Sequence, residues 1–270
     1  MKNLISIVCL VACFSHFSSQ KIIRQDIFSP KMNKKIKTII ITPDLQPDVT
    51  YKSVYILHGY SRNPERTLQK DIPDLVLKAQ EYQTIYILPD GNYNSWYVDS
   101  PIKKDSQYQT FIGEELVGFI NRNYPVKTEK KFRGILGWSM GGYGATNIGV
   151  TYRKIFGVVG SSCGALDFRS FGKEYTNYQV DKVLGSFPDL DVNFLTDSKI
   201  ELMKTASQYY IFDCGTEDDQ MITQNRKFHD QLTHAKIGHL YIESPGKHDP
   251  EYWSQSLSNQ LSLFERYFKK

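Results

Sequence analysis

Cysteine is scarce in this sequence, with four residues in 270. Cys9 and Cys13 lie at the very start, so Cys163 and Cys214 are the only two left for a folded domain. Two cysteines are too few for a disulfide framework, and their neighbours show no metal-binding spacing. Both fall near predicted strand ends, where a bridge is conceivable, but we expect two buried free thiols. A chain of this length can bury a large core without disulfides or metals.

A strong charge imbalance is also missing. The 33 lysines and arginines face 29 acidic residues, which leaves a formal net charge of +4. A nucleic-acid-binding protein normally carries a denser basic stripe or a recognisable module. We interpret the lysine clusters as solvated surface; they lie at Lys31, Lys34, Lys35 and Lys37, and at Lys269 and Lys270. The sequence therefore predicts no nucleic-acid partner.

The N-terminal apolar run is too short to cross a bilayer as a helix. It extends over residues 4–14 behind a short basic head, and small polar residues follow at 15–20. This order is typical of a secretory signal peptide, so we predict one over residues 1–20, followed by a single domain over residues 21–270. A buried first helix or strand is the alternative.

Two processing routes fit this leader. The L-V-A-C run ending at Cys13 resembles the lipobox of bacterial lipoproteins, in which the cysteine would be lipidated and would anchor the protein to a membrane. Ordinary cleavage near residues 18–20 is the other route. Either route predicts export, to the periplasm, the cell surface or the medium.

Beyond the leader, short runs rich in Val, Ile, Leu and Tyr alternate with helical patterns. The strand-like runs lie at 38–42, 53–57, 84–88, 132–136, 158–159, 209–212 and 240–242, and the helical patterns at 73–81, 112–123, 140–150, 222–235 and 253–268. Continuous apolar runs suit strands buried on both faces of a parallel sheet. The alternation predicts a doubly wound, mostly parallel α/β sheet flanked by helices.

One segment breaks this rhythm. Residues 165–204 are polar, aromatic and irregular, and they stand between two predicted strands. Long insertions of this kind are usually functional or flexible. We expect this one to form a cap or wall of an active site within the same domain.

The strongest chemical motif is G-x-S-x-G at residues 137–141, centred on Ser139. A predicted strand precedes it and a glycine-rich helical segment follows it, which is the context that a nucleophile turn requires. Such a turn lifts the serine hydroxyl above the sheet edge and directs the N–H of Met140 toward developing negative charge. A glycine turn that serves packing alone is the competing interpretation.

A serine nucleophile needs a histidine base and a carboxylate that orients the histidine, in the chain order serine, acid, histidine. Glu217, Asp218 and Asp219 compete for the acid because all three follow the strand predicted at 209–212. His248 is the favoured base, since it lies in the loop between the last strand and the last helix. The other histidines lie in the leader, before the serine, within a helical pattern or at a strand start: His16, His58, His229, His234 and His239.

Together these residues resemble the esterase D and feruloyl esterase group of α/β-hydrolases, which also includes the mycolyltransferases. The resemblance runs from about Thr38 to the C-terminus. It is carried by Y-I-L-H-G-Y at 55–60, L-P-D-G at 88–91, N-S-W-Y at 94–97, G-W-S-M-G-G at 137–142, C-G-T-E-D at 214–218, and G-K-H-D at 246–249 with Trp253.

The resemblance implies an α/β-hydrolase fold that needs no metal or cofactor, with Ser139 as nucleophile and His248 as base. It ranks Asp218 above its neighbours as the acid, because the family pattern reads C-G-T-x-D. It also makes the N–H groups of Tyr60 and Met140 the oxyanion hole. Lys247 departs from the pattern, since relatives usually have glycine before the histidine.

We also expect Trp96 and Tyr97 to line the substrate site, although aromatics near a strand end could equally serve packing. The predicted activity is hydrolysis of a carboxylic ester through an acyl-enzyme. The expected substrate is a small or polysaccharide-linked ester, such as a feruloyl or acetyl ester of plant polysaccharide. An acyltransferase of the mycolyltransferase type and a catalytically inactive binding domain are the alternatives. The sequence does not predict the oligomeric state.

Overall fold

The computed structural model describes residues 22–270. Eight strands form one sheet in the order β1-β2-β4-β3-β5-β6-β7-β8, and all neighbours from β4 to β8 are parallel. The pairs β1–β2 and β2–β4 are antiparallel. The strands are β1 (Ile22–Ser29), β2 (Lys34–Ile41), β3 (Lys52–Leu57), β4 (Thr84–Pro89), β5 (Arg133–Trp138), β6 (Val158–Ser162), β7 (Tyr209–Gly215) and β8 (Leu240–Ser244). This architecture confirms the predicted fold class.

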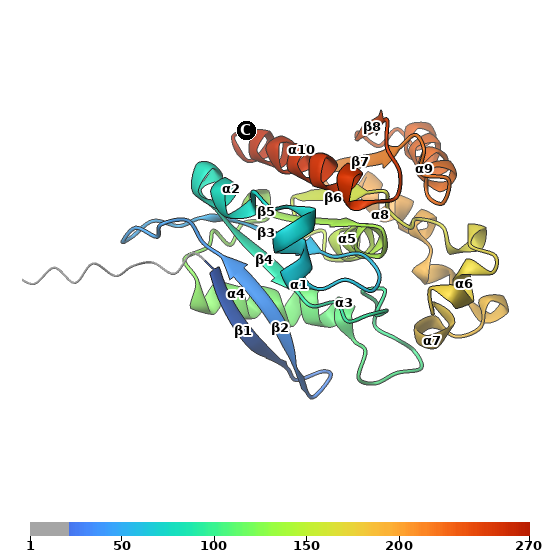
Figure 1. The fold of residues 1–270 in the computed structure, drawn as a ribbon, viewed down its shortest axis with the longest axis horizontal. Coiled ribbons are helices and arrows are strands. Elements are labelled where there is room, and N and C mark those ends of the chain that lie inside the picture. Colours follow the sequence, from blue (N-terminus) through green and yellow to red (C-terminus); the bar gives the residue numbers. More distant parts are fainter. Residues whose placement is uncertain (1–21) are drawn as a thin grey trace, which may run out of the picture.

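Helices cover the sheet on both sides, and Figure 1 shows α2 and α10 on one side with α4 on the other. The α-helices outside residues 165–204 are α1 (Pro64–Arg66), α2 (Leu75–Tyr82), α3 (Tyr108–Thr110), α4 (Val117–Asn123), α5 (Met140–Thr151), α9 (Ile222–His234) and α10 (Pro250–Phe268). Two π-helical segments interrupt this series, η1 (Thr67–Asp71) and η2 (Phe111–Leu116).

Helices α10 and α5 pack closely against the sheet because glycines at the contacts leave room for neighbouring side chains. A Cβ on Gly134 of β5 would lie 2.7 Å from the ring of Phe264 in α10, so the bare glycine makes room for that ring. Gly149 of α5 likewise makes room for Val159 of β6, since a Cβ on this glycine would lie 2.6 Å from the Val159 side chain. Close packing of this kind fixes both helices relative to the strand ends.

Two elements differ from the sequence-based expectation. Strand β1 is an additional edge strand whose residues are mostly polar or half-exposed, so it lacks the apolar run that marks the other strands. The helix expected at 112–123 begins earlier and is divided into α3, η2 and α4.

The irregular segment at 165–204 folds into short helical turns. It is the yellow and light-orange region of Figure 1 that contains α6 and α7. Its α-helices are α6 (Glu174–Asn177), α7 (Asp181–Leu184) and α8 (Ile200–Lys204), joined by 3₁₀ turns.

Among residues 22–270, no helix combines the length and apolarity needed to cross a bilayer. The predicted signal peptide over residues 1–20, including Cys13, lies outside the described residues. Cys163 and Cys214 are buried free thiols.

Candidate active site

Ser139 sits on a sharp turn between β5 and α5. Its backbone angles, φ 54° and ψ −120°, lie in a region that non-glycine residues rarely adopt. The flanking glycines are a steric requirement, since a Cβ on Gly141 would lie 2.0 Å from the carbonyl oxygen of Leu57. A Cβ on Gly137 would meet the carbonyl oxygen of Gly141 at 2.2 Å. The motif therefore specifies a tight turn whose conformation is held by its neighbours.

The structure brings Ser139, His248 and Asp218 into one hydrogen-bonded chain. His248 Nε2 lies 2.9 Å from Ser139 Oγ, and His248 Nδ1 lies 2.6 Å from Asp218 Oδ2. Since a carboxylate accepts only, Nδ1 carries a proton, and in the neutral imidazole Nε2 is left to accept from the serine hydroxyl. This is the geometry in which an imidazole can take a proton from an alcohol.

Burial separates Asp218 from the two other candidate acids. Asp218 is 1 % exposed, whereas Glu217 and Asp219 are exposed. Its second oxygen, Oδ1, accepts from the N–H of Met221 at 3.1 Å. The acid loop is also tied to the histidine loop, because the N–H of Glu217 donates to the carbonyl oxygen of Gly246 at 2.9 Å. These bonds hold the carboxylate against the imidazole.

Burial and hydrogen bonding have opposite effects on the pKa of His248. Burial alone would lower the pKa of His248, but hydrogen bonds with Asp218 and with the Cys163 side chain outweigh it and raise the pKa from 6.5 to about 9. Burial raises the pKa of the Cys163 thiol well above its usual range, so this thiol is neutral beside the imidazole. The edge of His248 packs against Trp253, with the ring centres 5.0 Å apart.

Within residues 22–270, Cys163, Asp218 and His248 form a group that could hold a metal, since their ligand atoms lie within 4.8 Å of one another. Two of these atoms already bond to each other, so a metal there would break the link between Asp218 and His248. The arrangement fits proton transfer better than metal binding.

Tyr60 lies in a tight turn beside Ser139. The N–H of Arg62 donates to the carbonyl oxygen of Gly59 at 3.2 Å, and the N–H of Ser61 donates to that of Tyr93 at 2.9 Å. Gly59 approaches the serine so closely that its Cβ would lie 3.5 Å from Ser139 Cβ. Met140 is the first residue of α5, and its backbone N–H therefore belongs to the unpaired helix N-terminus. The structure thus places both predicted oxyanion donors next to the nucleophile candidate.

His58, which chain order excluded as a base, supports this turn. It is 1 % exposed, accepts from the N–H of Gly91 at Nε2 (2.8 Å) and donates from Nδ1 to the carbonyl oxygen of Gly59 (2.8 Å). Both ring nitrogens are therefore used in joining the loops that follow β3 and β4.

Comparison with known proteins agrees with this geometry. Residues 29–264 match the family model described as “Putative esterase”. The chain belongs to this esterase family. This esterase is 31 % identical over 271 residues to the acetyl esterase of Caldicellulosiruptor saccharolyticus, with 90 % of this chain and 98 % of the relative covered. It is therefore a carboxylic ester hydrolase.

Solved structures show the same fold. FphF, a fluorophosphonate-binding serine hydrolase of Staphylococcus aureus, aligns with a TM-score of 0.79 at 20 % identity, covering 90 % of this esterase and 98 % of FphF. A ferulic acid esterase aligns with a TM-score of 0.75 at 24 % identity, covering 92 % and 98 %. The family match and these folds confirm the resemblance drawn from the sequence and the α/β-hydrolase fold.

A cavity of about 230 Å³ opens at the serine of this esterase. Its nine lining residues are Gly59, Tyr60, Ser61, Arg62, Ser139, Tyr178, Gln220, His248 and Trp253. Tyr178 comes from the irregular segment at 165–204, which therefore supplies part of the wall. No sequence pattern marks Arg62, Tyr178 or Gln220 as site residues, because their approach to Ser139 depends on how distant loops pack.

Trp96 and Tyr97 are placed differently from the expectation that they line the site. They are 1 % and 0 % exposed, and neither is among the residues that line the cavity. Trp96 donates to the carbonyl oxygen of Tyr178 at 3.1 Å, and Tyr97 donates to that of His58 at 3.1 Å. Both buried side chains therefore bind the backbone of neighbouring loops instead of lining the cavity. This agrees with the alternative that they serve packing.

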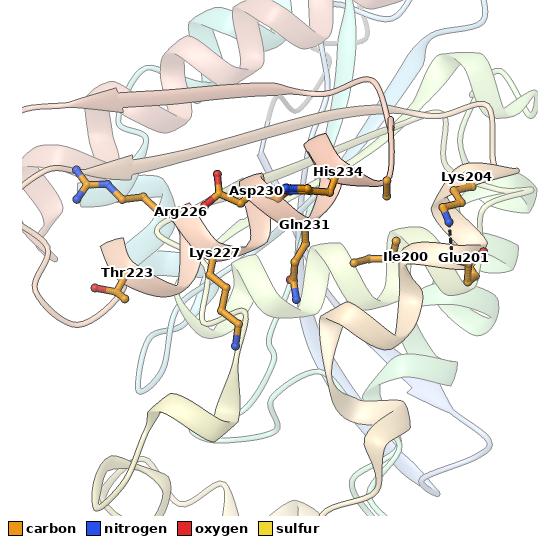
Figure 2. Close-up of a pocket in the computed structure, with 10 residues that line it drawn as sticks. Ile200, Glu201, Lys204, Thr223, Arg226, Lys227, Asp230, Gln231 and His234 are labelled. Atoms are coloured by element: carbon orange, nitrogen blue, oxygen red, sulfur yellow. Dashed lines mark hydrogen bonds and ion pairs between the residues drawn. The ribbon is translucent and has the colours of Figure 1, made fainter.

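A second, wider cavity of about 740 Å³ lies over α8 and α9, where Figure 2 shows its side chains spread along the two helices. Five of its ten lining residues are charged, and Lys204 pairs there with Glu201. It holds no serine or cysteine beside its one histidine, His234. It therefore lacks the serine–histidine pair that lines the smaller cavity.

The raised pKa of His248 predicts the pH dependence of this esterase. Only the neutral imidazole can accept the serine proton, so kcat/KM is expected to rise with pH through a limb above 6.5, the ordinary histidine value. Removing the Asp218 charge should move the limb to lower pH, because that hydrogen bond raises the pKa. Measuring kcat/KM from pH 5 to 10 in the wild type and in Asp218→Asn checks both; a limb that stays in place in the variant would contradict the assignment.

Proposed function

We propose that this protein is a serine esterase that works through an acyl-enzyme, with Ser139 as nucleophile, His248 as general base and acid, and Asp218 as the orienting carboxylate. The observation that carries the proposal is the hydrogen-bonded chain from Ser139 Oγ through His248 to Asp218, at 2.9 and 2.6 Å. A serine hydroxyl is a weak nucleophile unless such a base accepts its proton.

In the proposed mechanism, Ser139 Oγ attacks the ester carbonyl while His248 Nε2 takes its proton. The N–H groups of Tyr60 and Met140 hold the oxyanion, and loss of one such donor typically costs about 3 kcal/mol of barrier. His248 then gives the proton to the leaving alcohol. Water, activated by the same nitrogen, attacks the acyl-enzyme and frees Ser139. Asp218 stabilises the imidazolium at each step without taking its proton.

We propose acetyl esters of carbohydrate as the substrate class, and feruloyl esters as the second choice. The similarity to an acetyl esterase favours the first, and the fold shared with a ferulic acid esterase supports the second. Tyr60, Tyr178 and Trp253 offer aromatic surface on which a sugar or phenyl ring can pack. Export through the predicted leader would give the enzyme access to extracellular polysaccharide.

A substrate panel tests this function. Purified protein is given acetylated xylan, methyl ferulate, a short-chain p-nitrophenyl ester and S-formylglutathione, and kcat/KM is compared. We expect acetyl esters to give the highest values and free acetate to be the product. Acetyl transfer to an added sugar alcohol in preference to water would indicate an acyltransferase instead. Failure to hydrolyse every ester would contradict the proposal.

A further inference from the structure

Arg62 gives the catalytic cavity a fixed positive charge. Among the nine lining residues it is the only one that is charged at every ordinary pH, His248 being titratable. Its side chain is half-buried, and no residue in the described part of the chain forms an ion pair or side-chain hydrogen bond with it. Because Arg62 lines the cavity and its guanidinium has no side-chain partner within residues 22–270, the five N–H donors are available to a ligand.

The charged residues near Arg62 do not neutralise its positive charge. Arg66 lies close enough to repel it, and burial together with this repulsion lowers the pKa of Arg62. The Glu65 carboxylate is engaged elsewhere, by two bonds from Arg24 at 2.5 and 3.0 Å. Asp71 is the one acid that acts on Arg62. Two arginines thus face a single nearby carboxylate.

Asp71 is itself poorly satisfied. It is 0 % exposed, and neither of its oxygens has a hydrogen-bond partner among the described residues. Burial raises the pKa of Asp71 to about 6, against the opposing effect of Arg66, Arg62 and His58. The carboxylate therefore influences the arginines without binding the guanidinium of Arg62, whose donors stay free for a ligand.

We propose that Arg62 is a specificity residue that binds a carboxylate on the substrate, close to the ester bond that Ser139 attacks. The planar guanidinium matches a carboxylate with two parallel hydrogen bonds, a pairing that lysine cannot reproduce. Because Arg62 and Ser139 line the same small cavity, the anion and the scissile carbonyl belong to neighbouring parts of one substrate molecule. An ester carried on an acidic sugar, such as a uronic acid, has this chemistry. The inference rests on the proposed esterase function and narrows it.

Matched pairs of esters test the proposal. Phenyl acetate and 4-carboxyphenyl acetate differ by a carboxylate on the alcohol side, while p-nitrophenyl butyrate and the mono-p-nitrophenyl ester of succinic acid differ on the acyl side. For each pair the ratio of kcat/KM, anionic over neutral, is measured in the wild type, Arg62→Gln, Arg62→Lys and Lys70→Gln. Lys70 is an exposed cation in the same η1 segment as Asp71 and controls for net charge.

We expect Arg62→Gln to lower the ratio about tenfold or more for at least one pair, since a charge-assisted hydrogen bond is roughly twice as strong as one between neutral groups. Arg62→Lys should keep part of the ratio, and Lys70→Gln should leave it unchanged. Added salt should lower the ratio in the wild type and have little effect in Arg62→Gln. Thermal unfolding of each variant establishes that it is folded.

Two results would overturn the proposal. One is an anionic-to-neutral ratio of kcat/KM that is equal in the wild type and Arg62→Gln for both pairs. Arg62 would then have only an electrostatic role beside Asp71 and no role in substrate binding. The other is an equal fall in Lys70→Gln, which would assign the effect to overall charge. Failure of the esterase function itself has a different signature, because the wild type would then hydrolyse neither the neutral nor the anionic esters.

Discussion

Replacing Ser139 by alanine is expected to lower kcat/KM for p-nitrophenyl acetate by roughly 10⁴-fold or more, because the nucleophile of an acyl-enzyme mechanism cannot be replaced by its neighbours. The substitution removes a single oxygen from a side chain that is 8 % exposed. Alanine and serine tolerate the positive φ of 54° about equally, so the turn should persist. Steady-state rates and thermal unfolding measured on the same samples check the result.

Ser161→Ala is the matched control. Ser161 lies on β6 beside β5, is fully buried, and its hydroxyl has no hydrogen-bond partner among the described residues. Removing an unsatisfied hydroxyl should leave both stability and rate nearly unchanged. A Ser139→Ala protein that keeps wild-type turnover would assign the nucleophile to another residue.

The second large effect is expected at Asp218. Asp218→Asn should lower kcat by roughly 10³- to 10⁴-fold, because an amide at this position can donate to Nδ1 and so stabilise the wrong imidazole tautomer. Asp219→Asn changes the same chemical group one residue later, at an exposed position, and should alter kcat by less than about twofold. Comparing kcat and unfolding temperature for the pair separates catalysis from folding. A larger loss of kcat in Asp219→Asn than in Asp218→Asn would show that the assignment of Asp218 as the acid is wrong.

The central part of the fold was predictable because its strands are buried on both faces. Such strands appear as continuous apolar runs, and the residues just beyond their carboxyl ends meet at one edge of the sheet. This explains why Ser139 could be singled out from its motif between a strand and a helix, and His248 from chain order and position. Position alone left the three neighbouring acids equal, and only the resemblance ranked Asp218 first. In the structure Asp218 is the buried one of the three, and its carboxylate contacts His248.

The remaining features depended on packing between distant segments. Strand β1 escaped prediction because polar residues interrupt its apolar ones, as suits an edge strand that is stabilised by pairing with β2. Trp96 and Tyr97 stand beside a strand end in the sequence, but only tertiary structure decides whether a ring faces a cavity or the core. Arg62 and Tyr178 reach the cavity from a turn and from the irregular segment, neither of which has a periodic pattern.

Covalent labelling with a fluorophosphonate probe shows directly whether Ser139 is the nucleophile. The probe phosphonylates an activated serine and leaves a stable adduct that peptide mass spectrometry can locate. We expect one label per chain on the peptide that contains Ser139, loss of esterase activity in parallel with labelling, and no label in Ser139→Ala. An esterase that stays active and unlabelled, or a label on another residue that accompanies inactivation, would contradict it.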